Sequence, residues 1–335
     1  MQFEFSLSID LFDNFINIID LNSSLKSIDI PQKILDEFLI DEFKILGKIL
    51  NINYDAKDIR AYALGFSKIS SSFDSSIASG YRNSNEMIQS LYVDKGNIFT
   101  LNIISRVNKV LTENGFEIWE SGKLRNEKFP YNGELDFFKL ESLISDKDIY
   151  DNIYKIANYY KNDKYPNIIK VFVISYNLFR LKPFCVLNDI TIVIIMKILL
   201  FDIDFFNYVQ ILNIFYENID KLNPDIDLSE WLLNMSKFLL SDMKSQNEYI
   251  RKYISLDHRK FLSNNIIAKL NDRQKNIFFY LREHKNISRQ EYMRLFKISS
   301  MTAFRDLNEM KSLGVITSFG SGRGTRYTIL EKFLT

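Results

Sequence analysis

Residues 182–189 read Lys-Pro-Phe-Cys-Val-Leu-Asn-Asp, and they separate two strongly apolar segments. The first segment spans residues 168–179 and the second spans residues 190–201. The second is interrupted by Lys197 and is shorter than the ~20 apolar residues that a membrane span needs. We therefore expect it to form a buried core helix rather than to cross a membrane.

The loop resembles the signature of the Fic family: His-Pro-Phe, an acidic residue, any residue, Gly-Asn-Gly-Arg, two further residues and Arg. Pro183, Phe184 and Asn188 match this signature, while Lys182 replaces the His and Cys185 replaces the acidic residue. The glycines and arginines of the signature are replaced by Leu187, Asp189, Ile190 and Val193. The resemblance implies a helical body in which the loop joins two core helices. In the family the His removes a proton from a target hydroxyl, the acidic residue holds Mg and the Gly-Asn-Gly backbone cradles nucleotide phosphates.

Each replacement disfavours that chemistry. Lys182 is charged at neutral pH because a lysine titrates near ~10.4, and Cys185 offers a soft thiol where Mg prefers oxygen. Leu187 lacks the backbone freedom of glycine. Asp189 adds a negative charge near any phosphate, which costs up to ~4 kcal/mol at ~4 Å and an effective dielectric constant of ~20. We expect no nucleotide transfer and no cofactor, and we expect Asn188 or Asp189 to cap a helix that begins at Ile190.

Two other segments resemble parts of Fic proteins. Residues 67–71, Ser-Lys-Ile-Ser-Ser, resemble an inhibitory Ser-x-Ile-Glu-Gly segment in which Ser70 and Ser71 replace Glu-Gly. Residues 122–140 resemble the flap, a short β-hairpin that holds a target peptide by strand addition. Within it, Asn132-Gly133 is a plausible turn, and Tyr131, Asn132 and Gly133 are the candidate contacts for a protein partner. A plain surface loop is the alternative interpretation of this segment.

Composition limits the class of protein. The chain has 335 residues, 46% of them hydrophobic, which is enough for about two domains with a sizeable core. One cysteine excludes an internal disulfide, and we identify no secretory signal, so we expect a cytoplasmic protein. Abundant Asn, Ile, Lys and Phe indicate an AT-rich genome, and we expect a bacterial protein. His258 and His284 are the only histidines, which disfavours a histidine metal site or a Ser-His-Asp triad.

Most of the chain shows helical periodicity. Apolar residues recur at helical spacing in residues 34–50, 99–114 and 148–161. Trp231 lies in an amphipathic stretch, and we expect it in the core. The predicted fold class is therefore mainly α.

Charge is distributed unevenly along the chain. Residues 251–335 contain 17 Lys and Arg and 7 Asp and Glu, a balance of +10. The remaining 26 basic and 35 acidic residues give the rest of the chain a balance of −9. A basic C-terminal module on an acidic body indicates nucleic acid binding, or alternatively docking of the module on an acidic body.

The C-terminal segment predicts a winged helix-turn-helix. We expect helices from Asp272 to Glu283, from the Ser288 capping box to Leu295, and from a cap at Ser299 or Ser300 to Met310. Strands over 315–317 and 327–330 would flank a Gly-rich wing. The Thr-Ala-x-Arg-Asp-Leu core and the Gly-Arg-Gly-Thr-x-Tyr wing also resemble the C-terminal domain of longer Fic proteins.

The third of these helices would enter a DNA major groove. Arg305 is the candidate for a guanine edge, with phosphate, base or minor-groove contacts from Ser299, Ser300, Thr302, Arg323 and Arg326. Phe304, Leu307 and Met310 would form its core face. The alternative is an Arg305–Asp306 ion pair on a protein-interaction platform.

We therefore expect a helical region over 1–60, a Fic-like domain over 61–245, a connecting helix over 246–268 and a winged helix-turn-helix over 269–335. The leading hypothesis is a non-catalytic DNA-binding regulator whose body dimerises or senses a ligand. One alternative is a divergent transferase that uses ATP and Mg, with Lys182 as an electrostatic clamp and Asn188 as an anion holder. The other is a scaffold that binds protein at the flap.

Overall fold

The computed structural model describes residues 1–52, 56–64, 73–90, 99–140, 143–161, 164–206, 209–262, 266–330 and 333. The chain divides into two compact units, Met1–Asn247 and Glu248–Thr335. Helices dominate the described residues, which confirms the mainly α fold class. The finer predicted boundaries at residues 60, 245 and 268 remain predictions.

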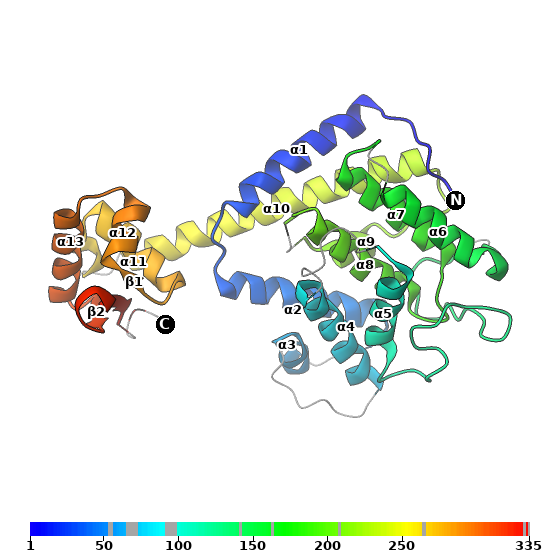
Figure 1. The fold of residues 1–335 in the computed structure, drawn as a ribbon, viewed down its shortest axis with the longest axis horizontal. Coiled ribbons are helices and arrows are strands. Elements are labelled where there is room, and N and C mark those ends of the chain that lie inside the picture. The colour runs from blue at the N-terminus through cyan, green and yellow to red at the C-terminus, as the bar shows by residue number, and fades with distance from the viewer. Residues whose placement is uncertain are drawn as a thin grey trace. The chain divides into compact units, whose positions relative to one another are not determined.

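The first unit is built from helices (Figure 1). Their bounds are α1 Ile9–Lys26, α2 Gln32–Ile49, α3 Ala56–Leu64, α4 Phe73–Ser90, α5 Leu101–Thr112, α6 Ile149–Tyr160, α7 Asn167–Leu181, α8 Asn188–Asp202 and α9 Ile211–Glu217. A 3-10 turn, Asp146–Asp148, precedes α6, and α10 (Leu228–Leu262) begins in this unit and continues past its end. The helices expected over 34–50, 99–114 and 148–161 are confirmed as α2, α5 and α6.

Helices α7 and α8 form the centre of the first unit. Both are buried along nearly their whole length, because apolar side chains occupy every face and must all be covered. Helix α6 packs against α7, and α5 and α4 pack against α8. The expected core helix over 190–201 is thus confirmed, and no helix within the described residues is long and apolar enough to cross a membrane.

Helix α1 lies along the first half of α10 (Figure 1), where Asn14 Nδ2 donates to Ser236 Oγ over 3.0 Å. Its inner face, which includes Phe15, packs on the core, and the ring of Phe15 stacks on that of Phe172. Trp231 on α10 is fully buried and donates from Nε1 to the carbonyl of Leu222. The prediction that Trp231 is a core residue is confirmed.

Besides the C-terminal part of α10, the described residues of the second unit form three further helices and a three-stranded antiparallel sheet. The helices are α11 Asp272–Glu283, α12 Arg289–Phe296 and α13 Ser300–Ser312. The strands are β1 Ile287–Ser288, β2 Ile316–Phe319 and β3 Arg326–Ile329. Two 3-10 turns lie at Ile267–Lys269 and Gly322–Gly324. Strand β3 is central, in the order β1-β3-β2. Capping boxes start α11 at Asn271 and α12 at Ser288. The predicted helices and wing strands are confirmed, whereas β1 is too short to show a pattern in the sequence.

One core assignment in this unit is wrong. Phe304 is 47% exposed, and Ala303 is buried in its place. Ala303, Leu307 and Met310 follow the four-and-three spacing of one helix face, and Phe304 lies one position off that face. Phe304 is therefore a surface residue of α13.

Candidate functional site

The loop that joins α7 to α8 is buried. Lys182 and Leu187, at its two ends, have left-handed backbone conformations with φ of 45° and 52° and are 0% exposed. This conformation costs a non-glycine residue roughly 1–2 kcal/mol. Leu187 thus keeps a backbone conformation that glycine adopts freely, and burial of its side chain offsets the cost.

Asn188 closes the loop rather than capping a helix. Phe184 N donates to Asn188 Oδ1 over 2.7 Å, and Asn188 Nδ2 donates to the Phe184 carbonyl over 2.9 Å. Helix α8 begins at Asn188, two residues earlier than expected, and its N-cap residue, Leu187, makes no side-chain cap bond. The prediction that Asn188 or Asp189 caps a helix from Ile190 is wrong, because both side chains are used elsewhere.

Lys182, Asp136 and Asp189 form a buried ion cluster. Lys182 Nζ pairs with Asp189 Oδ1 and lies 3.4 Å from Asp136 Oδ2, and all three side chains are 0% exposed. Asp189 N donates to Asp136 Oδ1 over 3.1 Å, and Tyr131 Oη donates to Asp136 Oδ2 over 2.8 Å. The cluster joins the end of α7, the start of α8 and the segment 122–140.

This environment changes the titration of the cluster. Burial raises the pKa of Asp189 to about 7; the nearby Lys182 ammonium opposes the rise, and the charge of Asp136 adds to it. Burial next to Asp136 also raises the pKa of Tyr131, so its hydroxyl remains a donor. One lysine cannot neutralise two carboxylates, so the cluster favours binding a proton.

The segment 122–140 covers the loop by backbone hydrogen bonds. Arg125 N donates to the Pro183 carbonyl over 3.0 Å, and Asn132 N donates to the Cys185 carbonyl over 2.7 Å. The Arg125 side chain donates to the carbonyls of Lys182 and Leu181 and pairs with Asp146. The structure therefore brings the predicted flap residue Asn132 against the predicted loop residue Cys185, whereas Tyr131 bonds Asp136 of the ion cluster.

The course of this segment differs in detail from the expected hairpin. Residues 122–140 contain one isolated bridge, Leu124 with Phe184, and no strand pairing within the segment. One turn joins Asn126 and Phe129, whose backbones bond each other in both directions, and another runs from Gly133 to Asp136, with the ring of Tyr131 beside Gly133. The loop accepts hydrogen bonds from the backbone N–H groups of Arg125 and Asn132, which a bound peptide could otherwise use.

Cys185 is held as a thiol in this loop. Its Sγ lies 3.5 Å from the Phe129 carbonyl and 3.7 Å from the Lys123 carbonyl. Burial raises the pKa of Cys185 to about 11. The side chain is therefore neutral at physiological pH and poorly suited to hold Mg²⁺.

In the second unit, the start of α13 is built by its cap. Ser299 Oγ accepts from Thr302 N over 3.1 Å and contacts Thr302 Oγ1 at 2.9 Å. Ser300 is the first residue of the helix and is exposed. Ser299 and Thr302, two of the predicted DNA contacts at the start of α13, are therefore hydrogen-bonded to each other.

Asp306 has partners other than Arg305. Its carboxylate accepts from Arg273 Nε over 3.0 Å and from Tyr292 Oη over 3.0 Å, and it is 3% exposed. The considered Arg305–Asp306 ion pair is thus replaced by Arg273–Asp306. Among the described residues no hydrogen bond or ion pair holds the side chain of Arg305, which is exposed.

The wing arginines differ from Arg305. Arg326 donates to Asn286 Oδ1 over 2.7 Å and pairs with Glu291 at 3.4 Å, so it is fixed beside the start of α12. The side chain of Arg323 lies outside the described residues. Among the described residues, Arg305 and Ser300 are thus the predicted contacts that are exposed and have no side-chain hydrogen bond or ion pair.

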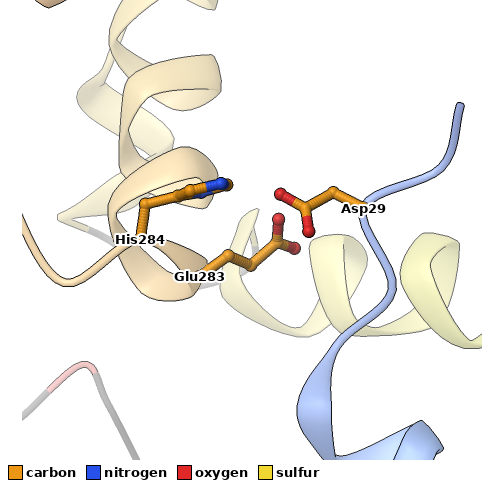
Figure 2. Close-up of side chains that lie close together, drawn as sticks. All are labelled: Asp29, Glu283 and His284. Atoms are coloured by element: carbon orange, nitrogen blue, oxygen red, sulfur yellow. The ribbon is translucent and has the colours of Figure 1, made fainter. Parts of the chain in front are cut away.

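His284, in the second unit, has local contacts. Figure 2 shows Glu283 and His284 where α11 ends. The ring of His284 stacks on Tyr280 with 4.1 Å between centroids. Asp29, also labelled in Figure 2, belongs to the first unit. A metal site made from both units would require a fixed placement of the units, so we interpret His284 by its contacts within α11 alone.

Comparison with solved structures identifies the architecture. A Fic family protein from Desulfovibrio desulfuricans G20 matches with a TM-score of 0.59 at 11% identity, over 99% of both chains. Fic-1 from C. elegans matches with a TM-score of 0.53 at 12% identity, over 71% of this chain and 70% of that chain. A Fic domain containing signaling protein from Bacteroides thetaiotaomicron matches with a TM-score of 0.51 at 12% identity, over 72% of this chain and 98% of that chain.

The chain has the Fic fold. In addition, residues 273–320 match the model of a DeoR-like helix-turn-helix domain. No curated protein matches the sequence. The expected Fic fold and the expected helix-turn-helix are both confirmed.

Sequence reasoning missed two central residues of the buried site in the Fic fold. Asp136 and Arg125 lie in the flap-like segment, where no motif distinguishes them. The sequence offered one signal of this cluster. Lys182 and Asp189, which stand at the His and second Gly positions of the Fic signature, lie seven positions apart and can neutralise each other. Ser70 and Ser71, which stand where the inhibitory segment of the family has Glu-Gly, lie outside the described residues.

We expect Asp189→Asn to flatten the pH dependence of stability. Because burial raises the pKa of Asp189 from about 3.8 to about 7, the native state binds the proton more tightly than the unfolded state. This contribution to the free energy of unfolding is complete below pH ~4 and is lost as the pH rises towards ~7. Urea denaturation across that range, followed by fluorescence of Trp119 and Trp231, reports on the first unit because both tryptophans lie in it.

Asp242→Asn is the matched control for this experiment. Burial raises the pKa of Asp242 on α10 to about 7 as well, and it accepts from Gln210 and Gln246 rather than from the loop. The two variants should therefore flatten the slope separately and additively. An Asp189→Asn slope equal to that of the wild type would contradict the titration of the cluster.

Proposed function

We propose that this protein is a DNA-binding transcriptional regulator whose Fic-fold body has lost nucleotide transfer. The observation that carries the proposal is the exposed helix α13 in a domain that matches a DeoR-like helix-turn-helix. The net positive charge of residues 251–335 supports the proposal, because phosphate contacts dominate affinity for DNA. We place its action in the cytoplasm, where the DNA of a bacterial cell lies.

In this proposal α13 enters the major groove. Arg305 reads a guanine edge, since arginine donates to both guanine acceptors there. Ser300 and the backbone at the start of α13 meet phosphates, together with Ser299 and Thr302. Arg326 and Arg323 contact the DNA backbone or minor groove from the wing.

The buried loop supports a non-catalytic body. Lys182, Asn188 and Asp189 are 0% exposed and bonded to one another or to neighbouring segments. A nucleotide phosphate would meet the buried carboxylate of Asp189, and Mg²⁺ would meet a neutral thiol at Cys185. These residues do not fit ATP and Mg, so we derive no reaction step through them.

The body then has a regulatory role, either in dimerisation or in sensing a ligand. Dimerisation would suit a helix-turn-helix, because paired recognition helices read two half-sites. Protein binding at Tyr131, Asn132 and Gly133 is less favoured. The backbone N–H of Asn132, which a bound peptide could use, already donates to Cys185.

We expect Arg305→Ala to weaken binding to the protein's own upstream DNA selectively. Loss of a bidentate contact to guanine costs about 1–3 kcal/mol, or roughly 5- to 150-fold in affinity. Fluorescence anisotropy across a salt series measures both the affinity and the number of phosphate contacts. Lys311→Ala removes one charge from the other end of α13. It should weaken binding to the upstream DNA and binding to random DNA by the same factor.

The outcomes separate three cases. Selective loss in Arg305→Ala supports base reading by α13. An equal loss of affinity for the upstream DNA and for random DNA would mean that Arg305 contacts a phosphate rather than a base. No binding of the wild type at low salt overturns the proposed function and leaves the basic module as a docking domain.

We also expect α13 to read thymine methyl groups. Met301 is 66% exposed and Phe304 is 47% exposed, three residues apart on the helix that carries Arg305. In the major groove the apolar feature of a base pair is the thymine methyl. Replacing thymine with uracil in the bound DNA should weaken the wild type, and Phe304→Ala should lose this sensitivity. Leu295→Ala, an exposed apolar residue on α12, is the control that should retain it.

We expect the protein to transfer no label from ATP in the presence of Mg²⁺. The physical reason is that Lys182, at the position of the catalytic His, is buried and paired with Asp189. Incubation with labelled ATP, alone and with a cell extract, measures this. Metal-dependent labelling that Lys182→Ala abolishes would establish the alternative of a divergent transferase.

A further inference from the structure

Helix α13 carries an exposed amide side chain that the base contacts described above do not include. Asn308 lies three residues after Arg305, and both residues are exposed. The buried face of the helix is formed by Ala303, Leu307 and Met310. Because each helical residue is turned by about 100° from the one before it, Arg305 and Asn308 lie on the opposite side. Both side chains therefore face away from the core of the second unit.

Most polar side chains of α13 are already engaged. Five of them have hydrogen-bond partners within the second unit: Thr302, Asp306, Glu309, Lys311 and Ser312. Among the described residues, no hydrogen bond or ion pair holds the side chains of Ser300, Arg305 and Asn308. Of these three, only Arg305 and Asn308 offer more than one polar atom to a ligand. They are thus the two side chains of α13 that can make paired hydrogen bonds.

The amide of Asn308 matches the edge of one base. An asparagine side chain has an acceptor, Oδ1, beside a donor, Nδ2. In the major groove, adenine presents the N7 acceptor beside the N6 amino donor, so Nδ2 can donate to N7 while Oδ1 accepts from N6. Guanine presents two acceptors and therefore suits the guanidinium of Arg305. Asn308 is also the one amide side chain in the sequence of α13.

The neighbours of Asn308 favour a base rather than a phosphate as its partner. Met301 and Phe304 are 66% and 47% exposed and lie on the same outer side of α13. Apolar side chains gain nothing from contact with a phosphate, whereas the major groove offers them thymine methyl groups. This side of the helix is therefore better suited to the floor of the groove than to its charged edge.

We propose that Asn308 reads an adenine in the major groove, at the base pair next to the guanine assigned to Arg305. The inference rests on the proposed function, in which α13 enters that groove, and it adds a second base that the helix selects. Arg305 and Asn308 are about 4.5 Å apart along the helix axis. Successive base pairs are about 3.4 Å apart, so the two side chains reach neighbouring pairs.

Replacement of single adenines by 7-deazaadenine in the upstream DNA tests this assignment. The analogue keeps its base pairing but lacks the N7 acceptor, so it removes a contact in the major groove alone. At one adenine position we expect the full-length wild type to lose affinity roughly fivefold or more. Asn308→Ala should lose nothing further at that position, because its contact is already absent. Fluorescence anisotropy at a fixed salt concentration measures both affinities.

Gln290→Ala is the matched control, since it removes an exposed amide from α12 instead of α13. It should respond to each analogue as the wild type does. Asn308→Ala should fold normally, because alanine favours a helix more than asparagine does. Its melting temperature checks this. A parallel scan with 7-deazaguanine, in the wild type and in Arg305→Ala, locates the guanine beside which the adenine should lie.

Three results would overturn the assignment while DNA binding by the wild type stands. One is the same response of the wild type and Asn308→Ala at every adenine. Another is an equal loss of affinity in Asn308→Ala for the upstream DNA and for random DNA, which would mean a phosphate contact. The third is a coupled adenine more than two base pairs from the guanine coupled to Arg305. No binding of the wild type at low salt would instead overturn the proposed function, and this inference with it.

Discussion

The ion cluster of Lys182, Asp136 and Asp189 is the constraint on which the centre of the first unit depends. Removing a buried charge from its partner leaves an uncompensated charge, which is far more costly than the intact pair. The three side chains come from the end of α7, the segment 122–140 and the start of α8. No one of these segments can therefore move away alone. Arg125 strengthens the same junction, because it bonds the last carbonyls of α7 and pairs with Asp146.

The cluster also explains how the loop is held although it matches few positions of the Fic signature. Pro183, Phe184 and Asn188, which match the family, hold the loop through the paired bonds between Phe184 and Asn188. Lys182 and Asp189, which do not match, neutralise each other at 0% exposure. Without Lys182, the carboxylates of Asp136 and Asp189 would be buried together with no cation between them. Lys182 is thus the residue that allows both carboxylates to be buried beside the loop.

The sequence predicted those features that arise from local patterns. The apolar run of α8, the capping box at Ser288 and the helices of the second unit depend on spacing along the chain, and they were found. The role of Asp136 depends on the path of the irregular segment 122–140, which no periodicity encodes. Phe304 was misplaced because one residue along a helix changes its direction by about 100°, and small Ala303 gave no sign that it takes the core position. The missed helix cap has a different origin: Asn188 bonds the backbone of Phe184 within the loop, and Asp189 bonds Lys182 and the N–H of Phe138.

Arginine has opposite roles in the two units, and the difference follows from the carboxylates around it. Arg125 is 4% exposed and is held by Asp146 and three backbone carbonyls, so it is structural. In the second unit Arg273 occupies Asp306, which Tyr292 also holds from the core side. Because Asp306 is already satisfied and fixed, it does not draw its neighbour Arg305 back onto the helix. The same bonds that lock α13 to α11 and α12 therefore leave Arg305 exposed on a rigid helix, and a rigid donor loses little entropy when it binds a base edge.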